Sequence, residues 1–216
     1  MLNLDPATLI ARLIVLVITF TIHEFAHAWT ATQFGDETPR QNGRLTLNPL
    51  SHLDPMGSLL LLLVGFGWAK PVPINPYVLN RRTPAAVMWV SLAGPFSNLL
   101  MAILAAVPFR MGLVSITAGL TTTRAILPNL SQIMVQFILI NLLLCLFNLI
   151  PLAPLDGEKI IDYFLPPRLA KVFEDIRPYG PIILIVVVLV GPMFGFDIIG
   201  MIIMPPLRAL FGLLVG

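Results

Sequence analysis

The sequence has very few residues that ionise or cross-link. Only 11% of its 216 residues are charged, three are histidines and one is a cysteine. The single cysteine, Cys145, excludes an internal disulfide and a zinc site built from several thiolates, and its apolar surroundings favour a role as a small buried residue. A net charge of +2 is too small to indicate a nucleic-acid-binding surface. The remainder is 57% hydrophobic, well above the proportion in soluble domains.

Long apolar runs predict an all-α polytopic membrane protein. Three runs, at residues 7–34, 85–108 and 129–150, are long enough for helices that cross a hydrocarbon core of about 30 Å. Gly94-Pro95 interrupts the hydrogen-bond ladder midway along the second of these helices. We therefore expect a core of three transmembrane helices.

Two further regions are apolar without being clear single spans. The stretch at 57–68 is too short for a full crossing, and the surrounding segment, 43–80, is rich in turn-forming residues and predicts a re-entrant or extended structure. The C-terminal region, 178–216, is interrupted by Gly191-Pro192 and predicts one or two further helices. Residues 158–178 hold many of the remaining charges and predict an interfacial helix and loop.

An ionisable cluster interrupts the first apolar run. His23 and His27 are four residues apart, so a helix places both imidazoles on one face, where they can bind a single metal ion. Glu24 lies beside them and can accept a proton from a water that the metal activates. This H-E-x-x-H pattern is typical of zinc metalloproteases. The alternative is a pair of ordinary surface or core histidines, but ionisable residues within a membrane are costly and mark function by default.

A catalytic zinc needs a third protein ligand, and Asp156 is the best candidate. It follows a segment at the end of the third apolar run that Pro151 and Pro154 force out of a regular helix. The alternative is that Asp156 only caps a helix that begins near Glu158. The remaining histidine, His52, is either a hydrogen-bonded loop residue or a group with a metal or substrate role.

The positions of these ligands predict the topology. For Asp156 to meet the histidines, the helices at 7–34 and 129–150 must cross in the same direction, and 57–68 must dip in and return. Most lysines and arginines then share the side of the membrane that the positive-inside rule makes cytoplasmic. We therefore expect the N-terminus outside and the metal toward the cytoplasmic leaflet. The basic residues on the expected cytoplasmic side are Arg40, Arg44, Lys70, Arg81, Arg82, Lys159, Arg168, Lys171 and Arg177.

The chain resembles the site-2 protease family of intramembrane zinc metalloproteases. The resemblance rests on H-E-F-A-H in the first run, A-G-P-F-S-N at 93–98 and N-x-x-P leading to L-D-G at 155–157. The segments G-R-L-T-L-N-P-L-S-H-L-D-P at 43–55 and G-W-A-K-P-V-P-I-N-P at 67–76 resemble the short prokaryotic branch, and the chain has no room for a PDZ or CBS domain. Together these motifs span roughly residues 20–160.

The resemblance implies a function and a set of site residues. It implies one Zn²⁺ held by His23, His27 and Asp156, with Glu24 as general base. It also implies that Asn148 and Asn98 lie near the substrate. The family cleaves transmembrane helices of other proteins, so single-span membrane proteins are the expected substrates and the cell membrane the expected location. We expect one membrane-embedded domain, 1–216, with its catalytic core at about 7–160.

Two other functions remain open at this stage. A metal-handling transporter could also place histidine and aspartate within the membrane, but it would not explain a glutamate directly after the first histidine. A non-catalytic relative could bind transmembrane helices as a scaffold, although the intact Glu24 argues against this.

A separate hypothesis concerns how the protease would bind its substrate: residues 43–55 and 69–76 could pair with an unwound substrate by β-augmentation.

Overall fold

The computed structural model describes residues 5–57, 67–121 and 126–216. Within these ranges every regular element is helical, and the only β-type pairing is an isolated antiparallel bridge between Leu53 and Ala69. Five helical stretches are long and apolar enough to cross a membrane. The predicted all-α polytopic architecture is therefore confirmed.

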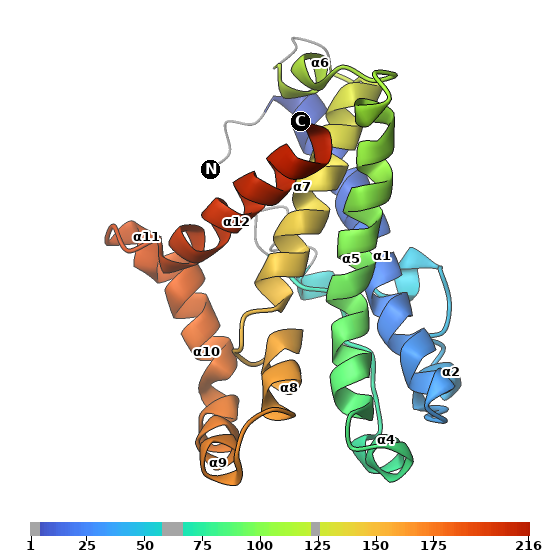
Figure 1. The fold of residues 1–216 in the computed structure, drawn as a ribbon, viewed down its shortest axis with the longest axis vertical. Coiled ribbons are helices and arrows are strands. Elements are labelled where there is room, and N and C mark those ends of the chain that lie inside the picture. Colours follow the sequence, from blue (N-terminus) through green and yellow to red (C-terminus); the bar gives the residue numbers. More distant parts are fainter. Residues whose placement is uncertain (1–4, 58–66, 122–125) are drawn as a thin grey trace.

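Three packed helices form the core: α1 (Pro6–Gln33), α5 (Ala86–Arg110) and α7 (Leu130–Asn148). Their bounds agree with the apolar runs within a few residues. Each of the three contacts the other two. Helices α1 and α7 begin at the same end of the bundle and run in the same direction, while α5 runs the opposite way (Figure 1). This is the arrangement that the predicted ligands require.

Side-chain caps define where α1 and α7 begin. The Asp5 carboxylate accepts the backbone N–H of Thr8 at 3.0 Å. At the start of α7, Asn129 and Gln132 form a reciprocal capping box. Both caps satisfy N–H groups that have no partner in the helix itself and that would be costly to expose to lipid.

Gly94-Pro95 interrupts the hydrogen-bond ladder of α5 without ending the helix. Helix α5 runs continuously through both residues, although Pro95 lacks the N–H that would bond one turn back. Close neighbours on both sides explain why the helix persists, because α1 and α7 pack against it along its length. Ser97 also donates from its hydroxyl to the Gly94 carbonyl at 2.7 Å.

The segment at 43–80 is partly extended, as predicted, but it also contains helix. A 3₁₀ turn, η1, spans Pro49–Ser51, and α4 (Pro76–Arg82) occupies the end that was expected to be extended. Asn75 explains this correction, because its side chain caps α4 by accepting from the N–H groups of Tyr77 and Val78. Lys70 donates its N–H to the His52 carbonyl at 2.8 Å, so the residues just before position 54 lie next to the residues just after position 68. Most of the predicted dip at 57–68 lies outside the described residues.

The C-terminal region forms two helical stretches. After α8 (Asp156–Asp162), a continuous helical run extends from α9 (Pro167–Ile176) through η2 (Arg177–Tyr179), α10 (Gly180–Ile185) and η3 (Val186–Val190) to α11 (Gly191–Met193). This run begins earlier than the predicted residue 178 and absorbs much of the expected interfacial segment, because Arg177 and Pro178 continue the helix as a 3₁₀ turn. The last helix, α12 (Ile198–Val215), returns to pack on α5 and α7.

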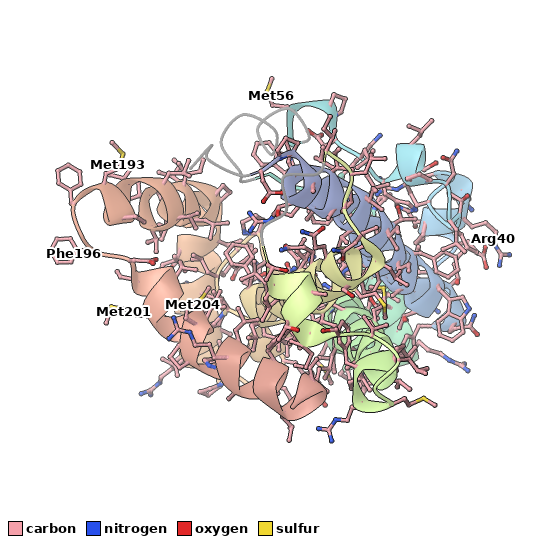
Figure 2. The ribbon with its side chains drawn as sticks, turned by 90° about the horizontal axis from the view of Figure 1, so that it is seen from above. Arg40, Met56, Met193, Phe196, Met201 and Met204 are labelled. Carbon is pink, nitrogen blue, oxygen red and sulfur yellow. The ribbon has the colours of Figure 1, made fainter. Side chains whose placement is uncertain are left out.

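The corner between α11 and α12 projects from the bundle. Met193, Phe196 and Met201 point away from the core helices in the view from above (Figure 2), and 82%, 67% and 76% of their surfaces are exposed. Apolar side chains exposed to this extent suit a hydrocarbon environment rather than water. The corner therefore fits a lipid-facing part of a membrane protein.

A buried hydrogen bond between α1 and α7 gives a test of the core. Asn141 donates to the Thr19 hydroxyl at 3.1 Å, and neither residue is exposed. We expect Thr19→Val to lower the free energy of unfolding by about 0.6 kcal/mol, the average for an interhelical bond in a membrane. Thr32→Val is the matched control, because the Thr32 hydroxyl donates only within its own helix. Equal losses in both variants, measured by denaturant unfolding in detergent, would contradict the importance of the interhelical bond.

Candidate metal centre

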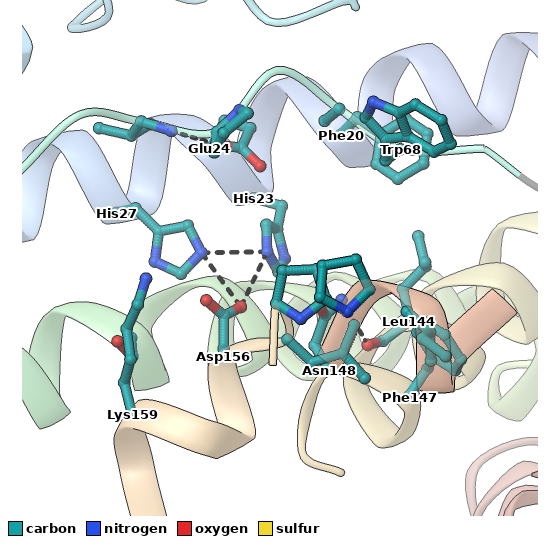
Figure 3. Close-up of a pocket in the computed structure, with 18 of the residues that line it drawn as sticks. Phe20, His23, Glu24, His27, Trp68, Leu144, Phe147, Asn148, Asp156 and Lys159 are labelled. Carbon is teal, nitrogen blue, oxygen red and sulfur yellow. Dashed lines mark hydrogen bonds and ion pairs between the residues drawn. The ribbon is translucent and has the colours of Figure 1, made fainter. Parts of the chain in front are cut away.

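Three side chains from two helices converge at one point. His23 and His27 come from α1, and Asp156 is the first residue of α8 (Figure 3). Their Nε2 atoms are 3.0 Å apart, and each lies 3.2 Å from Asp156 Oδ2. Ligand atoms around a tetrahedral zinc at about 2.0–2.1 Å would be separated by about 3.3–3.4 Å. The triangle therefore has nearly the dimensions that a zinc ion requires.

The hydrogen bonding of His27 shows that this triangle suits a cation. His27 Nδ1 lies 2.7 Å from the Val90 carbonyl, which can only accept, so Nδ1 carries a proton. In the neutral imidazole the Nε2 atom then presents a lone pair toward the carboxylate of Asp156 and the second imidazole. Asp156 Oδ2 is itself buried and receives no hydrogen bond of good geometry from any described residue. Lone pairs that meet in this way need a positive charge between them, and His₂Asp is a donor set that zinc accepts.

The end of α7 explains how Asp156 reaches this position. A methyl group at Gly157 would lie 2.4 Å from the carbonyl oxygens of Leu149 and Ile150, so only glycine lets α8 begin so close to the chain that leaves α7. The N-cap of α8 is Leu155, and the Asp156 side chain makes no capping bond. The alternative in which Asp156 serves as a cap is therefore wrong.

Helix α5 packs directly against the imidazoles. A methyl group at Gly94 would lie 2.4 Å from His27 Nε2 and 2.5 Å from His23 Cε1. Glycine is therefore required at this position for close approach rather than to break the helix. This contact and the Val90 carbonyl together orient the two rings.

Glu24 lies beside the triangle and is 8% exposed. Its Oε2 atom accepts the backbone N–H of Val72 at 3.1 Å and lies 3.8 Å from a guanidinium nitrogen of Arg44. These two contacts hold a carboxylate that would otherwise be costly to bury. Arg44, from the loop segment at 43–55, therefore contacts the site.

A pocket of about 440 Å³ opens onto these residues. Its volume lies within the range of small-ligand sites, and its wall is mainly apolar. Asn148 lines it, and its side-chain N–H donates to the Leu144 carbonyl at 3.0 Å. Lys159 is the only lysine or arginine among the described lining residues, and it lies on the side of the metal triangle opposite Trp68 (Figure 3).

The structure brings together five of the six predicted site residues. The exception is Asn98, which is fully buried in α5, does not line the pocket and has no hydrogen-bond partner for its side-chain amide among the described residues. His52 is a buried loop residue whose Nε2 lies 2.7 Å from the Thr46 carbonyl, in agreement with the first of its two interpretations.

Several pocket residues were not found from the sequence. Lys159 follows Asp156 by three residues, so helical periodicity could have placed it on the same face as the ligand. Ser91 precedes Gly94 by three residues on α5 and could have been found in the same way. Trp68 carried no such signal, because it lies in a loop whose path depends on tertiary contacts.

Comparison with known proteins agrees with this geometry. Residues 11–191 match peptidase family M50, which is most of the chain. The chain belongs to this family. It is therefore a zinc metalloprotease of the membrane, and the predicted site-2 protease resemblance is confirmed.

Individual M50 relatives are similar over most of their length. The chain is 43% identical over 182 residues to the "Putative zinc metalloprotease YwhC" of Bacillus subtilis, covering 84% of this chain and 81% of the relative. It is 31% identical over 183 residues to the "Putative zinc metalloprotease Rip2" of Mycobacterium tuberculosis, covering 83% and 67% respectively. No solved structure matches the chain significantly.

The contact between α5 and the imidazoles gives a second prediction. Gly94→Ala should displace one or both rings and lower the zinc affinity by about tenfold or more, a typical cost of disturbing groups that orient metal ligands. Gly212→Ala is the matched control, because a methyl group there, also within a helix, meets no atom within 4 Å. Zinc titration of both variants in detergent measures the effect, and equal affinities would contradict the predicted contact.

Proposed function

We propose that this M50 protease hydrolyses peptide bonds within transmembrane helices of single-span membrane proteins. The observation that carries the proposal is the triangle of His23, His27 and Asp156 at the edge of an apolar pocket. These three side chains would hold the zinc ion. The pocket is bounded by helices long enough to cross a membrane, so a substrate peptide would reach it from within the bilayer.

Glu24 is the proposed general base. When bound, zinc supplies a Lewis acid that activates a water and polarises the scissile carbonyl. Glu24 accepts the proton of the attacking water and passes it to the leaving amine. Its Oε2 atom is already bound by the Val72 N–H, so Oε1 is the oxygen free to take the proton.

Asn148 is the proposed substrate-binding residue. One of its two side-chain N–H groups donates to the Leu144 carbonyl, and its side-chain oxygen can accept from a backbone N–H of the unwound substrate. A substrate helix must unwind before cleavage, because its own hydrogen bonds occupy the scissile carbonyl. The corresponding role of Asn98 stays a prediction, and its position outside the pocket lining does not support it.

The extended segment 69–75 borders the pocket but offers few amide donors to a substrate. Pro71 and Pro73 have no N–H, and the N–H groups of Lys70, Val72 and Asn75 donate to other groups of the protein. Pairing by β-augmentation with this segment is therefore limited to a few bonds. Side-chain contacts in the pocket would have to supply the rest of the substrate affinity.

The active site is proposed to face the cytoplasmic leaflet. Helices α2 (Thr38–Gln41), α4, α8 and α9 lie at one end of the molecule, and the beginning of α1 and α6 (Ile116–Leu120) lie at the other (Figure 1). The first group and its adjoining loops carry most of the lysines and arginines. The positive-inside rule makes that end cytoplasmic. The His–His–Asp triangle lies toward this end, because His23 and His27 are in the later part of α1 and Asp156 is the first residue of α8.

The first test of this function is Glu24→Gln in the full chain. Wild type should cleave members of a panel of single-span helices in detergent or bilayers, whereas the variant should lose about 10²- to 10⁴-fold in kcat because it cannot take up a proton. Both should retain one zinc per chain, measured by metal analysis.

Other outcomes of this experiment separate the alternatives. Zinc in both proteins without cleavage by either would favour the scaffold, and metal flux that survives the loss of Glu24 would favour the transporter. Absence of zinc from both would contradict the metal centre itself.

A second test concerns Asn148. Asn148→Ala removes one hydrogen bond to the substrate and should raise KM by about 2- to 10-fold, the equivalent of a neutral hydrogen bond, with little change in zinc content. Asn42→Ala is the control, because the Asn42 side chain is exposed and bonds only to the Thr38 carbonyl. An unchanged KM for Asn148→Ala would exclude the proposed contact.

A further inference from the structure

Arg44 is a buried cation that the proposed chemistry does not use. Its side chain is only 4% exposed, in the loop that follows α2. The guanidinium donates to the carbonyl oxygens of Lys70 and Pro71, the second at 3.2 Å, and lies 3.8 Å from Glu24 Oε2. Its Nε atom has no hydrogen-bond partner among the residues that the structure describes. Burying an incompletely satisfied arginine is costly, so its retention at this position needs an explanation.

Consecutive backbone groups connect Arg44 to Glu24. Arg44 binds the carbonyls of residues 70 and 71, and the next N–H along the chain, that of Val72, donates to Glu24 Oε2. Arg44, residues 70–72 and Glu24 therefore form a closed ring of contacts, which we call the Glu24 clasp. The clasp engages one oxygen of Glu24 and leaves the other free.

The extended segment does not need Arg44 to stay attached to the protein. Near its start, the Lys70 N–H donates to the His52 carbonyl at 2.8 Å, next to the bridge between Leu53 and Ala69. At its end, the Asn75 N–H donates to the buried Asp36 at 2.6 Å. Arg44 acts between these anchors, where the segment passes Glu24.

We propose that Arg44 is a positioning residue for the reaction. By holding the carbonyls of residues 70 and 71, it keeps the Val72 N–H directed at Glu24 Oε2 and so fixes the orientation from which Glu24 accepts a proton. The inference rests on the proposed function, because it assumes that Glu24 is the base. A small displacement of a reacting group can cost about 10²-fold in rate, so such a contact can control turnover without touching the substrate.

The test compares Arg44→Gln and Arg44→Lys with Arg40→Gln in the full chain. Arg40 is a matched control because its side chain is 62% exposed at the periphery of the molecule (Figure 2) and pairs only with Glu37. We expect Arg44→Gln to lower kcat by about 10- to 100-fold with KM and zinc content within about twofold of wild type. Arg44→Lys, which keeps the charge and can reach one carbonyl, should recover part of the loss. Arg40→Gln should match wild type.

A second measurement does not depend on proteolysis. Between residues 69 and 75 the two prolines carry no amide hydrogen, so hydrogen–deuterium exchange of this segment reports on few amides, Val72 among them. Release of the clasp in Arg44→Gln should speed exchange at Val72 by about tenfold or more, while Lys70 and Asn75 keep their protection. Arg40→Gln should leave all three amides unchanged.

The outcomes separate the clasp from the proposed function. An unchanged kcat, a change confined to KM, or unchanged exchange at Val72 would overturn the positioning role. If Arg44→Gln loses zinc or aggregates, Arg44→Lys decides by the same criteria. If wild type itself cleaves nothing, the proposed function fails, and exchange at Val72 alone then decides whether the clasp exists.

Discussion

The structure depends on three polar ligand atoms meeting inside a protein that is otherwise mostly apolar. Two imidazoles of α1 and the Asp156 carboxylate lie within 3.2 Å of one another, and none of them is well exposed. Because Asp156 follows the end of α7, this meeting requires α1 and α7 to run in parallel and α5 to return between them. Two glycines then allow the necessary approach: Gly94 lets α5 pack on the imidazoles, and Gly157 lets α8 begin against the end of α7.

The same constraint shapes the surroundings of Glu24. A carboxylate next to a metal site in an apolar setting is stable only if fixed donors replace water, and here they are a backbone N–H and a buried guanidinium. Both belong to loop segments rather than to the core helices. The loops at 44–54 and 69–75 are joined by several hydrogen bonds, so they reach the site as one connected unit.

Membership of peptidase family M50 and the geometry of the site point to the same chemistry from independent directions. The pocket wall is mainly apolar and includes residues of α1, α7 and α10. An apolar wall suits the side chains of a transmembrane substrate, and a small number of polar groups then suffices to orient its backbone. Aromatic and aliphatic residues of the lining supply contact area. Ser91, Asn148 and Lys159 supply polar groups in addition to the metal ligands and Glu24.

The sequence by itself determined the number of core helices, because an apolar run of about 20 residues in lipid satisfies its own backbone hydrogen bonds as a helix. The positions of the predicted metal ligands determined the relative directions of these helices. The sequence also identified His23, Glu24, His27 and Asp156, because ionisable residues and broken helices within such runs are costly and therefore conspicuous. Other features depend on the tertiary structure and could not be predicted from local sequence patterns. Pro95 remains helical because neighbouring helices hold it, and Arg44 acquires a role only when the loop at 70–72 passes Glu24. Asn98 belongs to a recognisable motif but faces the buried interior, because the rotation of α5 is set by the packing of Gly94 on the imidazoles.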